Sequence, residues 1–132
     1  SDTELLLIAD DTGLPALCAV AESLAPGQRA RAFIEVADER EHQPISSEAT
    51  IETTWLHRDG TPPGLSPALV DAVLSLPTPS SATYVWGGGE SRIMTRIRKH
   101  VRREWGLARE QVDLTPYWRH KDSPVPTPED DE

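Results

Sequence analysis

The chain contains little cysteine and no long apolar run. Cys18 is the single cysteine among 132 residues, which excludes an internal disulfide and a zinc site built from several thiolates. No apolar stretch approaches the roughly 20 residues of a membrane-spanning helix, and no charged start followed by an apolar stretch marks a signal peptide. The sequence therefore predicts a cytoplasmic protein that does not insert into a membrane, with Cys18 packed in its core.

Basic residues are scarce as well. The chain has 13 Lys and Arg against 22 Asp and Glu, a formal net charge of −9. A general nucleic-acid binder needs a positive surface to displace the counterions of the phosphates, so nucleic acid is not expected as a partner. The charge is uneven, since residues 1–66 carry four basic and 12 acidic side chains whereas residues 67–121 carry nine basic and five acidic ones.

Two parts of the chain differ in composition. Residues 1–121 are long enough for one domain with a single core. Residues 122–132 hold five acidic side chains, prolines at positions 124, 126 and 128, and no apolar periodicity. Low hydrophobicity combined with charge of one sign is typical of disorder. We therefore expect residues 122–132 to form an acidic, proline-containing disordered tail.

Segments with the apolar pattern of strands alternate with segments of helical period. Strands are expected at Glu4–Ala9, Ala30–Ala37, Ile51–His57, Thr83–Trp86 and Gln111–Thr115. Helices are expected from Leu14 to Leu24, from Pro67 to Leu76 and from Ser91 to Trp105. This alternation predicts an α/β fold, an open three-layer sandwich in which a five-stranded, mostly parallel sheet carries helices on both faces.

In such sheets ligands bind beyond the carboxyl ends of the strands, so the residues that follow each strand are the candidates for a site. After the first strand, Thr12 and Gly13 lie in a tight turn into a helix, whose free N–H groups and positive dipole end suit a phosphate. The alternative is a plain helix cap supplied by Asp or Thr. The turn lacks the Gly-x-Gly-x-x-Gly dinucleotide fingerprint, and no Walker lysine is present.

Two further turns carry candidate residues. His57 and Arg58 follow the third strand, and an arginine grips a phosphate through two parallel hydrogen bonds, so Arg58 could bind the 2′-phosphate of NADP or simply lie in solvent. Gly88 and Gly89 follow the fourth strand as part of a triple glycine, which lets the backbone approach a flat ligand. Glu90 then starts a helix, and a turn followed by a cap explains this segment equally well.

Cationic side chains gather in the last third of the chain. The expected third helix carries a basic set that could steer an anion or form a solvated face paired with neighbouring acids: Arg92, Arg96, Arg98, Lys99, Arg102 and Arg103. After the last strand, Trp118, Arg119 and Lys121 combine an aromatic ring with cations, which suits a flat anionic partner. A packed tryptophan with incidental basic neighbours is the alternative.

Acid–base, nucleophile and metal patterns are missing. The four histidines lack metal-ligand spacing, Cys18 has no activating partner nearby in the sequence, and no serine lies in a Gly-x-Ser-x-Gly elbow. We therefore expect no metal site and no catalytic side chain. What remains is a dinucleotide-type site in which the cofactor carries the reaction and the protein positions it.

The segments at the strand ends resemble one family, the siderophore-interacting proteins, which are ferric-siderophore reductases of the ferredoxin-reductase-like superfamily. The resemblance covers nearly the whole chain up to Lys121 and rests on LLLIADDTGLPA, AFIEVAD, TWLHRDG, YVWGGGES, RKHVRREWGL and PYWR, in this order. It implies a C-terminal NAD(P)H-binding domain, with Thr12 and Gly13 near the pyrophosphate, His57 and Arg58 near the adenosine, and residues 88–90 near the nicotinamide. It also implies that Trp118, Arg119 and Lys121 help to receive an anionic ferric siderophore.

The same resemblance implies a flavin-binding barrel ahead of this domain, and no segment of the chain resembles that barrel. FAD is therefore expected only with a separate N-terminal domain, in cis or in trans, and NADPH or NADH as the cofactor of this part. The resemblance favours the cofactor-binding part of a flavin-dependent reductase, inactive on its own. One alternative is a non-catalytic module of the same fold that docks an anionic siderophore or a flavoprotein, and another is a flavodoxin-like domain that holds flavin itself.

Overall fold

The structure, a computed structural model, describes residues 3–131 and contains one five-stranded sheet. Its strands are β1 (Glu4–Ala9), β2 (Arg29–Val36), β3 (Thr50–His57), β4 (Tyr84–Glu90) and β5 (Val112–Trp118). They lie in the order β3-β2-β1-β4-β5, and every neighbouring pair is parallel. The predicted α/β fold is confirmed. The strand order reverses between β1 and β4, which is the place where such sheets bind ligands.

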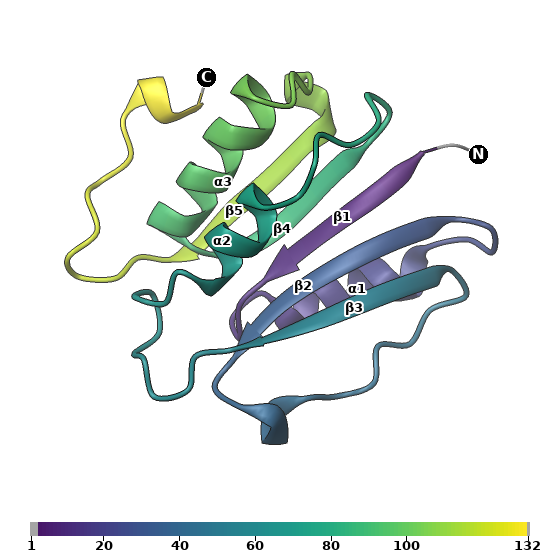
Figure 1. Cartoon of the computed structure of the whole chain (residues 1–132), viewed down its shortest axis with the longest axis horizontal. Helices are drawn as coiled ribbons and strands as arrows, with labels where there is room; N and C mark the ends of the chain where they lie inside the picture. The colour runs from purple at the N-terminus through teal and green to yellow at the C-terminus, as the bar shows by residue number, and fades with distance from the viewer. Residues whose placement is uncertain (1–2, 132) are drawn as a thin grey trace.

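Three α-helices cover the two faces of the sheet (Figure 1). Helix α1 (Leu14–Ser23) packs on one face, while α2 (Ala68–Leu74) and α3 (Ser91–Arg103) pack on the other. The short 3-10 helices are η1 (Glu39–Glu41), η2 (Arg109–Gln111) and η3 (Pro128–Asp131). The carboxyl ends of the strands all lie at the lower left of Figure 1, so the segments that follow them meet at one edge.

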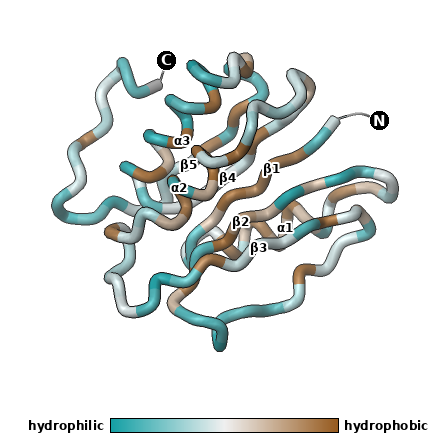
Figure 2. The backbone as a smooth tube through the Cα atoms, in the orientation of Figure 1, coloured by the Kyte–Doolittle hydropathy of each residue, from teal (hydrophilic) through white to brown (hydrophobic). Residues whose placement is uncertain are grey.

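Strand β1 is apolar throughout because both of its sides are covered. Leu7 and Ala9 point into the core beneath α1, whereas Leu6 and Ile8 belong to the core beneath α2 and α3. Alternate residues of a strand face opposite sides, so a central strand of a three-layer fold needs apolar residues at every position. Figure 2 shows β1 as a hydrophobic line through the middle of the molecule.

Strand β4 differs from the sequence-based prediction. It does not end at Trp86 but continues through the triple glycine to Glu90, so these glycines are strand residues and form no loop. A Cβ at Gly87 would lie 2.7 Å from Leu114 Cδ2 and 2.9 Å from the carbonyl oxygen of Ile8. Glycine is needed there because the side chain of β5 and the backbone of β1 fill the space. Strand β5 also continues beyond the expected Thr115, to Trp118.

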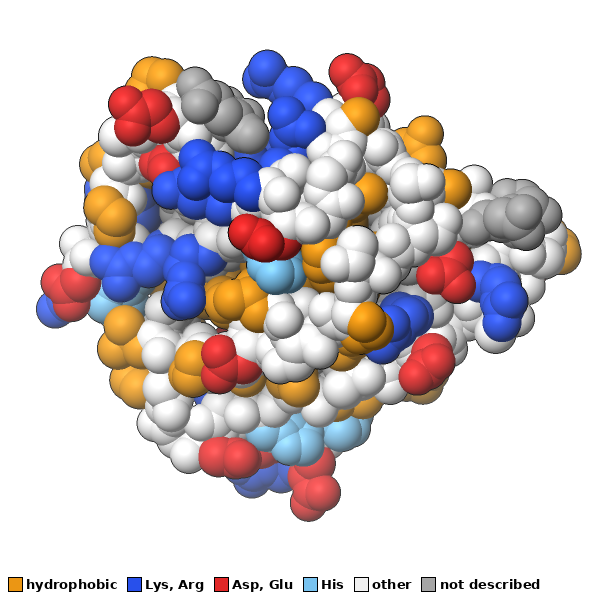
Figure 3. All heavy atoms as spheres, turned by 45° about the horizontal axis from the view of Figure 1, so that its top comes forward, with side chains coloured by type: hydrophobic (Ala, Val, Ile, Leu, Met, Phe, Trp, Pro, Cys, Tyr) orange, Lys and Arg blue, Asp and Glu red, His pale blue; other side chains and the backbone are white. Residues whose placement is uncertain are grey.

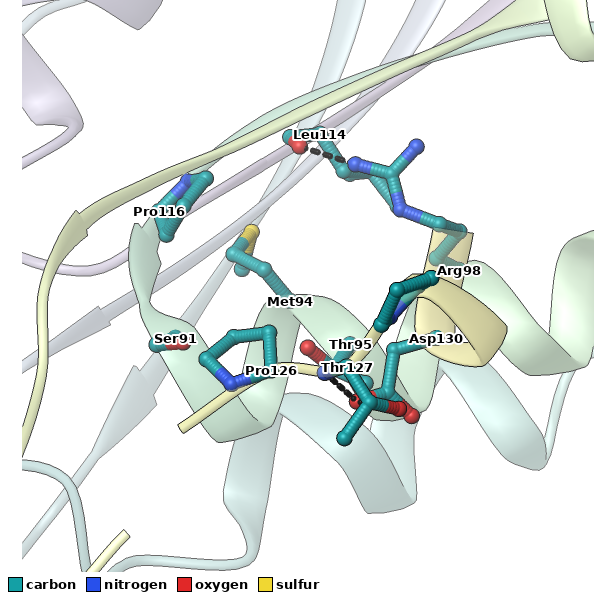
Figure 4. Close-up of a pocket in the computed structure, with 10 residues that line it drawn as sticks. Ser91, Met94, Thr95, Arg98, Leu114, Pro116, Pro126, Thr127 and Asp130 are labelled. Atoms are coloured by element: carbon teal, nitrogen blue, oxygen red, sulfur yellow. Dashed lines mark hydrogen bonds between the residues drawn. The ribbon is translucent and has the colours of Figure 1, made fainter. Parts of the chain in front are cut away.

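The prediction of a disordered tail is wrong for residues 122–131. The segment returns along α3, with Ser123 buried and Asp130 Oδ1 2.8 Å from Lys99 Nζ. Between this segment, α3 and β5 lies a hollow of about 460 Å³, where the Arg98 guanidinium donates to the carbonyl of Leu114 (Figure 4). The composition argument failed because it considered the acidic segment without the basic helix that binds it.

Lys and Arg side chains gather on the face that α3 and the C-terminal segment form (Figure 3). Several are engaged within the chain: Arg92 donates to the carbonyl of Asp122, and Arg102 donates to the carbonyl of Leu107. Lys99 is paired with Asp130. Of the two sequence-based interpretations of this helix, the structure favours a face whose cations are paired with neighbouring groups.

Candidate functional site

The side chain of Asp10 joins the turns at the carboxyl edge of the sheet. It follows β1, is 5% exposed, and its Oδ1 accepts hydrogen bonds from the amides of Thr12 (2.9 Å) and Gly13 (3.2 Å) and from the Thr12 hydroxyl. Its Oδ2 accepts from the amide of Glu90 (3.1 Å) and from Trp118 Nε1 (2.9 Å). One buried carboxylate thus binds groups that follow β1, end β4 and end β5.

The amides of Thr12 and Gly13, which we expected to bind a pyrophosphate, therefore donate to the Asp10 carboxylate instead. A carboxylate that accepts several N–H bonds satisfies the free donors at a helix start, as a cap does. Helix α1 itself begins after Gly13 with no side-chain cap from that residue. In this structure Thr12 and Gly13 lie where they were expected, but their amides and the Thr12 hydroxyl already have a partner within the chain.

Gly13 is required by the close approach of two backbones. A Cβ at this position would lie 2.2 Å from the carbonyl oxygen of Gly88, and the amide of Asp10 donates to the same oxygen at 3.4 Å. The β1–α1 turn is therefore packed directly on β4. The structure brings Gly13 and Gly88 together, as the sequence analysis expected of residues in one cleft.

An aromatic ring covers the glycine that was expected to face a nicotinamide. A Cβ at Gly88 would lie 3.0–3.3 Å from ring atoms of Tyr117, and one at Gly89 would lie 2.9 Å from Asp10 Oδ2. Tyr117, which is 43% exposed, comes from the extended part of β5. Sequence analysis missed its role, because the contact depends on how β5 pairs with β4.

Glu90 is fully buried and binds the end of the chain. Its Oε1 accepts from the amide of Ile93 (3.1 Å), so it caps α3. Its Oε2 accepts from the amide of His120 (3.0 Å) and the hydroxyl of Ser123 (2.8 Å). The cap interpretation of this residue is confirmed. The carboxylate also fixes the backbone that carries Arg119 and Lys121.

Arg58 lies between two acidic side chains after β3. Its Nη1 is 2.6 Å from Asp11 Oδ1 and 3.7 Å from Glu35 Oε2, and its side chain is 8% exposed. The hydrogen bond to Asp11 and the charges of both acids raise the pKa of the Arg58 guanidinium. The interpretation of Arg58 as a freely solvated side chain is therefore wrong.

Glu35, at the end of β2, is buried beneath Arg58. Burial raises the pKa of its carboxyl, while the Ser66 hydroxyl and the Arg58 charge act in the opposite direction. Its Oε1 is buried and has no hydrogen-bond partner in the part of the chain that the structure describes. A buried oxygen without a partner is costly, and such groups mark strained or functional places.

The His57 ring contacts the loop that follows β2. Its Nε2 lies 2.7 Å from Nε2 of His42, and the His42 ring stacks on Trp55 with centroids 4.6 Å apart. The pair ties the loop after β2 to β3. The structure therefore places the His57 ring against this loop, beside His42.

The hollow nearest to these groups lies beside the start of α1. It has a volume of about 310 Å³ and is lined by apolar and acidic side chains, among them Leu14, Pro15, Cys18, Val36, Asp11 and Glu41. Cys18 is half-buried at its wall, where it packs against the core beneath α1 and accepts a weak hydrogen bond from Gln43.

The aromatic and cationic residues after β5 divide into two groups. Trp118 is turned inward, since it donates to Asp10, and a Cβ at Gly64 would lie 2.8 Å from its ring. Arg119 and Lys121 are exposed, and Arg119 Nη1 donates to the carbonyl of Ser123 at 2.9 Å. Contact of Arg119 and Lys121 with a siderophore stays a prediction.

Residues 3–131 contain neither a cluster of metal ligands nor a helix suited to span a membrane. No group of three or more His, Cys, Asp or Glu side chains in this range is placed to hold a metal ion. None of the helices in the same range combines the length and the apolar character needed to cross a membrane.

Comparisons with known proteins place the chain in a family. The profile of the siderophore-interacting protein family matches residues 2–121. A siderophore utilization protein from T. fusca superposes with a TM-score of 0.83 and 35% identity, over 93% of this chain and 47% of that protein. The siderophore-interacting protein SipS from Aeromonas hydrophila gives 0.76 and 33%, over 89% of this chain and 51% of that one.

A curated relative carries an activity in its name. The ferric vibriobactin reductase ViuB of Vibrio cholerae is 29% identical over 116 residues, which are 86% of this chain and 42% of ViuB. The chain thus spans about half the length of the relatives that it matches, or less. Because the family profile covers nearly all of it, the chain belongs to the siderophore-interacting protein family.

Proposed function

We propose that the chain is the nicotinamide-dinucleotide-binding part of a flavin-dependent ferric-siderophore reductase that acts in iron release in the cytoplasm. The family match over residues 2–121 carries this proposal. The fold supports it, since the turns after β1 and β3 and the end of β4 are joined beside the point where the strand order reverses. Ligands of open parallel sheets bind at such points.

The adenosine half of NADH or NADPH fits the described residues best. The hollow of about 310 Å³ beside α1 has apolar walls for a flat base. The carboxylates of Asp11 and Glu41 at its wall offer acceptors to sugar hydroxyls. We infer that this hollow holds the adenosine and that the start of α1 lies nearest to the pyrophosphate.

A bound NADH or NADPH would supply a hydride, which carries two electrons, whereas Fe(III) accepts one. A flavin can divide the pair, so the proposal includes an FAD-binding domain, in cis or in trans. The chain's own contribution is to bind and orient the dinucleotide. Arg119 and Lys121, held by the contacts of Glu90 with His120 and Ser123, would attract the anionic ferric siderophore.

Calorimetric titration of the chain with NADH and with NADPH tests the proposal. Saturable binding of at least one of them supports it, with affinity lost in a Gly13→Glu variant that places a side chain against β4. Because the added side chain can also prevent folding, circular dichroism must show that the variant is folded. Absence of binding of both dinucleotides to the folded wild-type chain contradicts the proposal.

Two observations favour a second function, a non-catalytic module that docks an anionic siderophore or a flavoprotein. Asp10 already binds the amides of Thr12 and Gly13, and Tyr117 covers Gly88, so the pyrophosphate and nicotinamide positions are filled from within the chain. Titration with ferric vibriobactin separates the two functions. Binding of that siderophore without binding of NADH or NADPH favours the module.

A further inference from the structure

The contacts of Arg58 bear on which dinucleotide the site accepts. Arginine is suited to a phosphate because its planar fork donates two parallel hydrogen bonds. Here Asp11 takes that fork, with Nη1 2.6 Å from Oδ1 and Nη2 3.4 Å from Oδ2. A phosphate that needs the same nitrogens must first displace the Asp11 carboxylate.

Asp11 stands between Arg58 and the solvent. Its side chain is 46% exposed, whereas that of Arg58 is 8% exposed and that of Glu35, behind it, is 1% exposed. A ligand that enters from solvent therefore meets a carboxylate before it meets the guanidinium. The acceptor oxygens of Asp11 thus face solvent, whereas the donor nitrogens of Arg58 are buried.

The side chains around Arg58 are negatively charged, as a 2′-phosphate is. The charges of Asp11, Glu35 and Asp10 all act on Arg58. Three acidic side chains surround one basic side chain, and like charges at such distances repel across a partly buried site. Glu41 adds a fourth acid at the wall of the hollow that Asp11 also lines. A 2′-phosphate would bring two more negative charges into this cluster.

A ribose with a free 2′-hydroxyl is attracted by the same carboxylates that repel a 2′-phosphate. A hydroxyl donates to a carboxylate, and sites that take NAD use an acidic side chain as the partner of the ribose hydroxyls. Asp11 lies on the wall of the hollow proposed for the adenosine and can accept such a bond without leaving Arg58.

We propose that Asp11 is a specificity-determining residue that makes this site prefer NADH to NADPH by holding the Arg58 guanidinium away from a 2′-phosphate. The inference rests on the proposed function and concerns the same site. Its distinctive consequence is that Arg58 contributes to NADPH binding only after Asp11 is neutralised.

Four proteins test this by calorimetric measurement of the dissociation constants for NADH and NADPH: wild type, Asp11→Asn, Arg58→Ala and the double variant. We expect wild type to bind NADH more tightly, and Asp11→Asn to improve NADPH affinity by about tenfold with less change for NADH, since a charge-assisted hydrogen bond is gained. The double variant should lose that gain, which assigns it to the Asp11–Arg58 pair.

Asp59→Asn is the matched control. Asp59 is exposed and lies beside Arg58 in the chain, and its φ of 47° is a conformation that asparagine adopts readily. It removes the same charge without releasing Arg58, so its ratio of NADH to NADPH affinity should stay near that of wild type. Thermal unfolding of each variant confirms that the folded protein is compared.

The outcomes separate the two proposals. A wild-type preference for NADPH, or an Asp11→Asn variant with an unchanged affinity ratio, overturns the role of Asp11 and leaves dinucleotide binding intact. An equal gain in Asp59→Asn also overturns it, because general charge would then be the cause. If none of the folded proteins binds either dinucleotide, the proposed function and this inference both fail.

Discussion

Asp10 and Trp118 are separated by 108 positions in the chain and joined by a hydrogen bond of 2.9 Å between Oδ2 and Nε1. The bond links the end of the central strand β1 to the end of the edge strand β5. Together with the bond from the amide of Glu90 to the same oxygen, it fixes the carboxyl edge on both sides of the switch point. The Asp10 carboxylate is thus a structural centre of the candidate site.

We predict that Asp10→Asn destabilises the fold by about 3 kcal/mol. The carboxylate accepts five hydrogen bonds, and an amide in its place turns one acceptor oxygen into a donor that faces other donors. Urea unfolding followed by tryptophan fluorescence measures the change. Asp113→Asn, at an exposed position of β5, is the control and should remain near wild type. Equal effects of the two would contradict the central role of Asp10.

Gly13→Ala and Gly88→Ala should lower the free energy of unfolding by different amounts. At Gly13 the new Cβ meets the carbonyl oxygen of Gly88 at 2.2 Å, and a backbone atom cannot move aside, so we expect a loss of about 3 kcal/mol. At Gly88 the three nearest atoms all belong to the Tyr117 ring, which can turn toward solvent, and we expect about 1 kcal/mol.

A Tyr117→Ala change provides the check on that difference. Chemical denaturation should show that it restores most of the stability lost by Gly88→Ala and none of that lost by Gly13→Ala. If Tyr117→Ala rescued both variants alike, the assignment of the two contacts would be wrong.

Glu35 should make the stability fall as the pH rises. Its pKa is raised in the folded state, so between its ordinary value of 4.5 and the raised value the folded chain holds a proton that the unfolded chain has released. Stability therefore decreases with pH through that window, and Glu35→Gln should flatten the decrease. Denaturant midpoints across this pH range measure it, with the exposed Glu52→Gln as control; a Glu35→Gln profile parallel to wild type would refute the assignment.

The C-terminal segment should separate from α3 at low pH. Lys99 lowers the pKa of Asp130, so the pair is formed above the ordinary pKa of 3.8 and is lost as the pH falls through the lowered value. Asp130→Asn should loosen residues 124–131 already at neutral pH, with faster hydrogen exchange there, while Glu129→Gln leaves it unchanged. Exchange confined to other segments would disagree with this role of the pair.

The alternation of strands and helices could be predicted because it depends on local patterns. The unbroken apolar run of β1 indicates a strand covered on both faces, and the structure places it between β2 and β4. The boundaries of β4 could not be predicted, since glycine has no preference for strands. Its presence at position 87 depends on Leu114 and Ile8, which are distant in the chain.

The site could be predicted only in outline. Topology brings together the ends of parallel strands, so Thr12, Gly13, Arg58 and Glu90 could be expected at this edge from their positions, and their role in binding stays a prediction. What each side chain binds depends on pairs such as Asp10 with Trp118 and Arg58 with Asp11, which no local pattern reveals. Tyr117 was overlooked for the same reason, because its role follows from the pairing of β5 with β4.

The most direct test of the central claim, that the carboxyl edge binds a nicotinamide dinucleotide, is a map of amide chemical shifts during titration with NADH. We predict saturable shifts at Asp11, Gly13 and Arg58 and at the walls of the hollow beside α1. The control is the pocket between β5 and the C-terminal segment, whose amides should stay unmoved. Shifts that fail to saturate, or that cluster only around α3 and β5, would contradict the claim.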